Sequence, residues 1–173
     1  MRKLAILIIL VATAAVVFAQ DSPSKSASAQ SDAKKAFEKL KTLAGSWQGS
    51  IGDLSTQVTI RVTSAGSAIM QDAVRTGVSG NYNSITMMYL EGDRLLMTHY
   101  SEAGNRPRFE GKLSPDGKSV EFNLLDVPGG TQRGFLKRMM ITMDDANHHH
   151  VDVTFIPPDG KPIEARGEFQ RTK

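Results

Sequence analysis

The chain has 173 residues, 15 glycines and no cysteine, and its formal net charge is +3. This length corresponds to one domain. The absence of cysteine excludes both disulfide bonds and a lipid anchor on an acylated thiol. The basic residues are interspersed among acidic ones, which argues against a surface that binds nucleic acid. Because disulfide bonds are excluded, the fold must be held together by its hydrophobic core.

The first nineteen residues have the pattern of a secretory signal peptide. Arg2 and Lys3 form a positive start, and an unbroken apolar run follows at 4–19. This run is short for a membrane-spanning helix, which needs roughly 20 residues. We expect cleavage before Gln20, a periplasmic or secreted protein, and no membrane span after cleavage. An uncleaved N-terminal anchor is the alternative.

A linker and a short helix are expected to precede the domain. Residues 20–32 are rich in serine and alanine and contain little to bury, so they predict a flexible linker. A helix is predicted to begin near Ala33 and to end at Gly45. Its apolar residues recur at three- and four-residue spacing and are Phe37, Leu40, Leu43 and Ala44. The domain is expected to span 33–173.

Short alternating runs and turn signals dominate the rest of the sequence. Within 84–125, four runs of strand length are separated by three turns that contain Gly, Asn, Asp or Pro. The whole domain contains about ten such runs, which predicts an all-β, up-and-down antiparallel barrel or sandwich. A closed barrel is favoured because it leaves no long exposed edge. We expect the helix to plug one end, and ten strands are enough to enclose a ligand cavity.

Two segments resemble a known family. Gly45-Ser46-Trp47 lies where the first strand begins, and 98–108 reads THYSEAGNRPR. Together with the expected barrel they resemble lipocalin-like (calycin) proteins, above all small secreted bacterial ones of unknown function, over 37–171. The resemblance implies that an arginine of the last strand packs over Trp47. Arg171 is the first candidate for this role and Arg166 the second.

A more distant resemblance is to the nitrobindin branch of the same group. In that branch a ten-stranded barrel holds haem through a histidine near the C-terminus. This sequence has no histidine after His150. We therefore expect no cofactor.

The predicted ligand site is centred on His99. Leu95, Met97 and His99 alternate along one run, so they share a face; if that face points inward, His99 lies in the lumen, where it can orient a ligand or donate a proton. A structural histidine that is hydrogen-bonded in the core is the alternative. The candidate ligand-binding residues are His99, Tyr100, Arg108, Asp72, Met97 and Met139.

Some of these candidates have a plainer interpretation. Arg108 follows a turn at Asn105 and is placed either to grip a carboxylate at the barrel mouth or to lie in solvent. Met97 and Met139 belong to a methionine cluster that suits either a pocket lining or a core. The cluster comprises Met87, Met88, Met97, Met139, Met140 and Met143.

A run of three histidines invites a metal interpretation. On a strand, His148 and His150 share one face with Asp152, whereas His149 points to the other. Two histidines and a carboxylate form a sensible zinc set. The run begins beside a polar turn, however, so adventitious binding is the expected behaviour and no metal site is predicted.

The sequence contains no established catalytic motif. No serine lies in a Gly-x-Ser-x-Gly context, and no glycine-rich phosphate loop precedes a helix. We therefore predict a non-enzymatic exported barrel that binds a small hydrophobic or amphipathic molecule. The alternatives are a barrel enzyme that uses His99 as acid or base with Tyr100 and Arg108, and an interaction module of the cell envelope.

Overall fold

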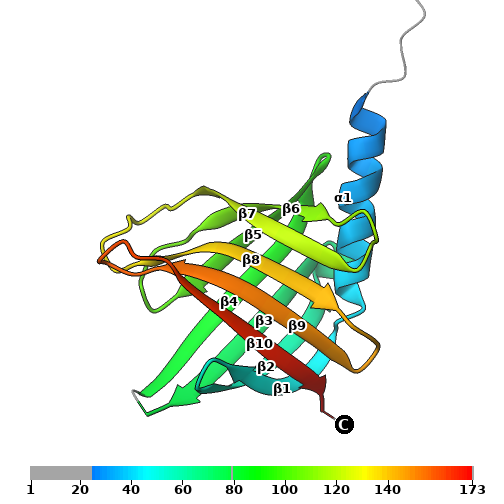
Figure 1. The fold of residues 1–173 in the computed structure, drawn as a ribbon. Helices are drawn as coiled ribbons and strands as arrows, with labels where there is room; N and C mark the ends of the chain where they lie inside the picture. Colours follow the sequence, from blue (N-terminus) through cyan, green and yellow to red (C-terminus); the bar gives the residue numbers. More distant parts are fainter. Residues whose placement is uncertain (1–24, 79, 173) are drawn as a thin grey trace, which may run out of the picture.

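The structure, a computed structural model, is a closed antiparallel β-barrel of ten strands with one α-helix (Figure 1). It describes residues 25–78 and 80–172, with side chains from Asp32 onward. The predicted signal peptide lies outside the described residues. The elements are α1 (Lys25–Lys41), β1 (Gly45–Ile51), β2 (Leu54–Thr63), η1 (Ser64–Gly66), β3 (Ala68–Gly77), β4 (Gly80–Glu91), β5 (Arg94–Ser101), β6 (Arg108–Leu113), β7 (Ser119–Asp126), β8 (Phe135–Met143), β9 (His148–Ile156) and β10 (Ile163–Arg171).

The barrel closes between its first and last strands. Each strand pairs with the next in sequence, and β1 pairs with β10 in a register that runs from Trp47 opposite Arg171 to Ile51 opposite Gly167. Gly49 permits the close pairing of β1 with β10, because a Cβ atom there would collide with the Glu168 carbonyl oxygen. The predicted barrel with about ten strands is thus confirmed, and the sandwich is excluded.

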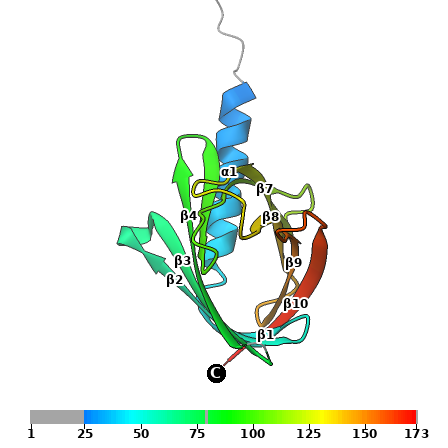
Figure 2. The same cartoon turned by 90° about the vertical axis from the view of Figure 1, so that its left-hand side faces the viewer.

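The two ends of the barrel differ. Because the strands alternate in direction, the connections alternate between the end near α1, which we call the helix end, and the opposite end, which we call the mouth. Loops of the mouth include residues 52–53, 102–107, 127–134 and 157–162. Figure 1 shows these loops on the left, away from α1, and in Figure 2 this end faces the viewer.

The helix begins earlier than the sequence predicted, at Lys25 instead of near Ala33. Part of the predicted linker is therefore helical, as the good helix propensity of its Ala, Lys and Gln residues allows. The helix packs against β4, β5 and β6. Its buried residues Phe37 and Leu40 join the hydrophobic core of the barrel. The expected apolar face is present at Phe37 and Leu40, whereas the helix ends at Lys41, before Leu43 and Ala44, and Ala44 is exposed.

Trp47 is buried between the helix and the barrel interior. Its side chain is 1% exposed, and its indole N–H donates to the Leu43 carbonyl at 2.8 Å. The Arg171 guanidinium carbon lies 4.1 Å from the ring centroid. The Arg171 guanidinium also donates to the carbonyls of Thr42 and Ala44. The contact implied by the resemblance is formed by Arg171, whereas Arg166 is paired with Asp152.

Side chains fill the helix-end half of the interior. Leu95, Met97 and Phe109 are 0% exposed. The methionine cluster divides between the two faces of the wall: Met88, Met97, Met139 and Met143 are buried inside, whereas Met87 and Met140 are on the outer face with Met70. Burial and register therefore assign the four inner methionines to the core, and any room for a ligand lies towards the mouth.

Candidate functional site

Polar side chains line one side of the interior towards the mouth. They belong to β2, β3, β4 and β5, four neighbouring strands, and we call them the polar wall. The polar wall consists of Thr56, Gln71, Arg75, Ser84, Thr86 and His99, and Tyr82 opposite Arg75 has the same parity as Ser84. Their inward direction follows from the register, because Ala73 is buried opposite both Val58 and Ser84. Side chains two positions apart on a strand share a face.

His99 is a neutral histidine inside the barrel. It is 7% exposed, and its Nδ1 shares a 2.9 Å hydrogen bond with the Thr86 hydroxyl. Burial, and after it the positive charge of Arg75, lowers the pKa of His99 to about 4. The face that His99 shares with Leu95 and Met97 thus points into the barrel. At neutral pH the imidazole offers one hydrogen-bond donor and one acceptor and carries no charge.

The sequence interpretation named only His99 of the polar wall, and Arg75 is the charged residue that it missed. Its Nη1 donates to the Ser84 hydroxyl at 3.0 Å, and burial lowers the pKa of its guanidinium. No ion pair joins it to a carboxylate of the described residues. The sequence of β3 does not reveal its inner face, because Met70 and Val74 on the other parity are as apolar as Ile69 and Ala73.

The opposite side of the interior is apolar. Its inward residues lie on β6 to β10 and are Phe109, Phe122, Leu124, Met139, Val153 and Phe169. The interior therefore has one polar and one apolar side. Such an arrangement suits a molecule that has a polar group at one end and a hydrocarbon body.

Solvent reaches the interior from the mouth. The inward residues nearest the mouth are only half-buried, and they include Ile51, Leu54, Arg75, Val153 and Ala165. One layer deeper, Ala73, Ser84 and Thr86 are buried. These half-buried inward residues, Arg75 among them, are the most accessible part of the interior, and we call this part the funnel.

The six predicted ligand-binding residues are divided between the two faces of the wall. His99, Met97 and Met139 are inside. Tyr100 is 43% exposed, on the outer face, one position after His99. Asp72 is also outside, opposite Ile85 on the neighbouring strand. Arg108 is exposed and forms a two-point ion pair with Asp126. The structure therefore does not bring these six residues together.

Asn105 is more than the turn residue that the sequence predicted. It is buried, and its side-chain amide donates to the carbonyls of Gly130 at 3.0 Å and Gly134 at 2.7 Å. The backbone N–H of Arg106 donates to the Pro128 carbonyl at 2.8 Å. Asn105 thus fastens two loops of the mouth to each other. This long-range role has no local sequence signal.

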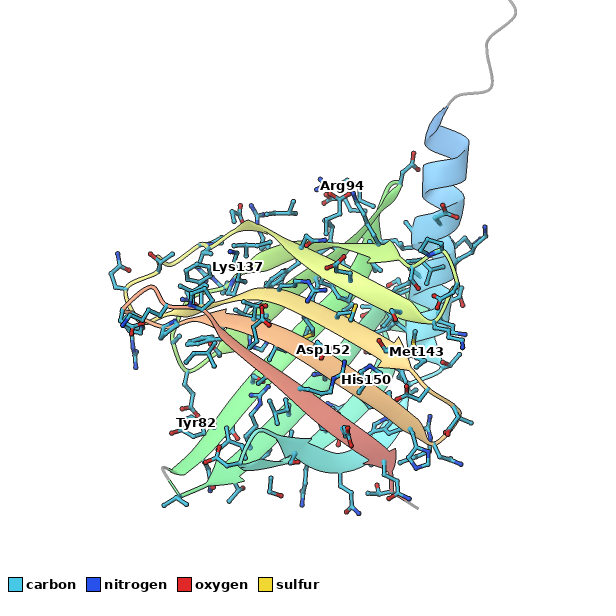
Figure 3. All side chains as sticks on the ribbon, in the orientation of Figure 1. Tyr82, Arg94, Lys137, Met143, His150 and Asp152 are labelled. Carbon is cyan, nitrogen blue, oxygen red and sulfur yellow. The ribbon has the colours of Figure 1, made fainter. Side chains whose placement is uncertain are left out.

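The triple-histidine run lies on β9 with the predicted alternation. His148 and His150 face outward, and Figure 3 labels His150 and Asp152 on this strand. His150 is bonded to Asp144 at 2.9 Å, and Asp152 is paired with Arg166. No group of three or more potential metal ligands is found within the described part of the chain. His148 and His150 are hydrogen-bonded to Asp145 and Asp144, respectively.

His149, by contrast, is part of the core at the helix end. Its ring makes an edge contact with Trp47 at 4.3 Å and stacks on Phe169 at 5.0 Å. Burial lowers the pKa of His149 to about 4, against the opposing effect of Asp144. The sequence interpretation gave this histidine no role, because alternation along a strand predicts the face on which a side chain lies but not the residues that it contacts.

Several hollows lie on the outside of the molecule. A groove of about 890 Å³ runs over β2, β1, β10 and β9 and is lined mostly by polar residues, among them Gln57, Gln170, His148 and Glu168. Smaller ones lie beside the middle of the helix and over β8 to β10. None of these three is lined by any of the six predicted ligand-binding residues.

Comparisons with known proteins support the fold alone. No family profile matches the chain, and no curated protein matches it in sequence. The structure of Rv2717c from M. tuberculosis is similar, with a TM-score of 0.62 and 12% identity over 80% of this chain and 98% of that one. A de novo designed fluorescence-activating β-barrel covers 76% of this chain and 94% of its own at 13% identity, with a TM-score of 0.43. The helix of the described region is not long and apolar enough to cross a membrane. The chain is thus a ten-stranded antiparallel barrel that shares its architecture with Rv2717c.

Proposed function

We propose that the chain is an exported, non-enzymatic barrel that binds a small amphipathic molecule at its mouth. The observation that carries the proposal is the division of the interior into the polar wall and an apolar side, with half-buried residues of both kinds at the mouth. A binding site of this kind needs an apolar lining and a few fixed polar groups. Export rests on the N-terminal sequence pattern.

The geometry around His99 favours binding over acid–base catalysis. A general acid or base works best with a pKa near the working pH, whereas the pKa of His99 is about 4. The candidate residue Asp72 is on the outer face, and the Glu102 carboxylate, three residues after His99, accepts a hydrogen bond from the backbone N–H of Asn83. Tyr100 and Arg108 are on the outer face as well. His99 is thus a fixed neutral hydrogen-bonding group.

Filling the mouth tests the proposal. Ala165 is half-buried on the inner face of β10, and Glu164 beside it is exposed on the outer face. We expect Ala165→Trp to weaken binding of Nile red, an uncharged dye whose fluorescence rises in apolar surroundings, by at least about tenfold, since the indole occupies the funnel. Fluorescence titration of the purified mature protein measures the affinity.

The matched control is Glu164→Trp, which adds the same indole outside and is expected to bind the dye like the unmodified protein. Thermal melts show whether both variants keep the fold. Equal dye affinity in all three folded proteins, or no dye binding by the unmodified protein, would contradict a binding site at the mouth.

A further inference from the structure

We infer that Arg75 is the receptor for a carboxylate, so that the ligand is a monoanionic amphiphile with its carboxylate at the polar wall and its hydrocarbon body against the apolar side. This inference rests on the proposed function and specifies the ligand class. It starts from one observation: Arg75 is a cation inside the barrel without an acidic partner among the described residues.

Four of the six other arginines of the barrel strands have a carboxylate partner; of the remaining two, Arg61 is exposed, and Arg171 donates to backbone carbonyls of Thr42, Ala44 and Ala146. Arg94, Arg108, Arg138 and Arg166 lie on the outer face, and each is paired with a carboxylate of a neighbouring strand. Those pairs form where water already screens the charges. Arg75 is more buried, where a charge is costly unless it is paired, yet the group that accepts its hydrogen bond is the neutral hydroxyl of Ser84.

The neighbours of Arg75 do not neutralise it. Thr56 on β2 and Tyr82 on β4 lie opposite Arg75, and neither carries a carboxylate; the Thr56 hydroxyl donates to the Leu54 carbonyl. Thr86 and His99 hydrogen-bond to each other, and His99 is uncharged. The polar wall therefore has a net charge of +1 and contains no acid. An anion that enters from the mouth supplies the missing negative charge.

The charge and geometry of the site select a carboxylate. A guanidinium matches the two oxygens of a carboxylate with two parallel hydrogen bonds. One isolated positive charge balances one negative charge, which fits a carboxylate better than a doubly charged phosphate. The inward residues across the funnel, Leu124 and Val153, are apolar and half-buried. They suit an alkyl or aryl body.

The test compares two molecules with the same chain and different head groups. Decanoate and 1-decanol, each below the concentration at which it aggregates, compete with Nile red for the full mature protein. A hydrogen bond to a charged group contributes about 1.5–3 kcal/mol, which corresponds to about 10- to 100-fold in affinity. We expect decanoate to bind the unmodified protein at least about tenfold more tightly than decanol.

Variants test whether Arg75 causes the preference for decanoate over decanol. We expect Arg75→Gln to weaken decanoate binding by the same factor and to leave decanol binding unchanged. Arg75→Lys keeps the charge and is expected to restore part of the preference, which also keeps the test decisive if the glutamine variant does not fold. Arg108→Gln, which alters an outer arginine, is the matched control and is expected to behave like the unmodified protein.

The outcomes separate this inference from the proposed function. Equal affinity for decanoate and decanol, or a preference that survives in folded Arg75→Gln, overturns the carboxylate receptor while leaving a binding barrel. Loss of the preference in Arg108→Gln places the receptor outside and also overturns it. If neither molecule displaces the dye and the dye itself does not bind, both the inference and the proposed function fail.

Discussion

At pH 4 the folded barrel is expected to be on the order of 5 kcal/mol less stable than at pH 7, because two buried histidines resist protonation. The pKa values of His99 and His149 are lowered to about 4 in the fold, from 6.5 for the free side chain. Between pH 6.5 and pH 4 the unfolded chain therefore binds protons that the folded chain does not. Stability is complete above pH 6.5, falls as the pH drops through this window, and levels off for these groups below pH 4. Each pKa unit corresponds to about 1.4 kcal/mol.

Denaturant unfolding at intervals of half a pH unit measures this loss. His99→Gln is expected to remove about half of the pH dependence, whereas His148→Gln, which alters an exposed histidine, should leave it unchanged. The carboxylates whose pKa values are lowered, such as Asp126 and Asp152, start from 3.8 and so contribute at lower pH. A free energy of unfolding that is flat from pH 7 to pH 4 would contradict burial of both imidazoles.

Removing the indole of Trp47 is expected to cost about 3–5 kcal/mol of stability, the usual range for deleting a buried aromatic side chain. The ring fills the helix end beneath Arg171 and touches His149, so its loss leaves a cavity where the chain enters β1. The free energy of unfolding of Trp47→Ala, from urea titration followed by far-ultraviolet circular dichroism, gives the cost.

Trp47→Phe is the matched comparison, because it keeps an aromatic ring and loses the N–H that donates to Leu43. We expect it to cost less than the alanine variant, with part of the loss arising from the unpaired Leu43 carbonyl. A cost below about 1 kcal/mol for Trp47→Ala would show that the helix end is held by something other than this ring.

The fold followed from the sequence because strand length and turn chemistry are local properties. The alternation of side chains along a strand also gave the right face for β5, because Leu95 and Met97 share one face and are both apolar. It failed on β3, where Met70 and Val74 on the outside are as apolar as Ile69 and Ala73 on the inside. There the face is set by pairing with β2 and β4, and a shift by one residue reverses it.

Of the residues in the polar wall, the sequence predicted His99 but not Arg75. His99 was found because its own strand has a clear pattern, whereas Arg75 was missed because its strand does not, and Asp72 was chosen in its place. The role of Asn105 depends on carbonyls of Gly130 and Gly134, far along the chain. Contacts of that kind are set by the closed barrel, so local sequence patterns do not reveal them.

Nuclear magnetic resonance of the imidazole nitrogens, with ¹⁵N-labelled histidine, tests a ligand site at the mouth most directly. The chain has four histidines; His99 lies in the polar wall, whereas His148 and His150 line the outer groove. On titration with decanoate we expect the ring signals of His99 to shift in a saturable way while those of His148 and His150 stay in place. Shifts at His148 and His150 with His99 unchanged would place the ligand in the outer groove and contradict the account.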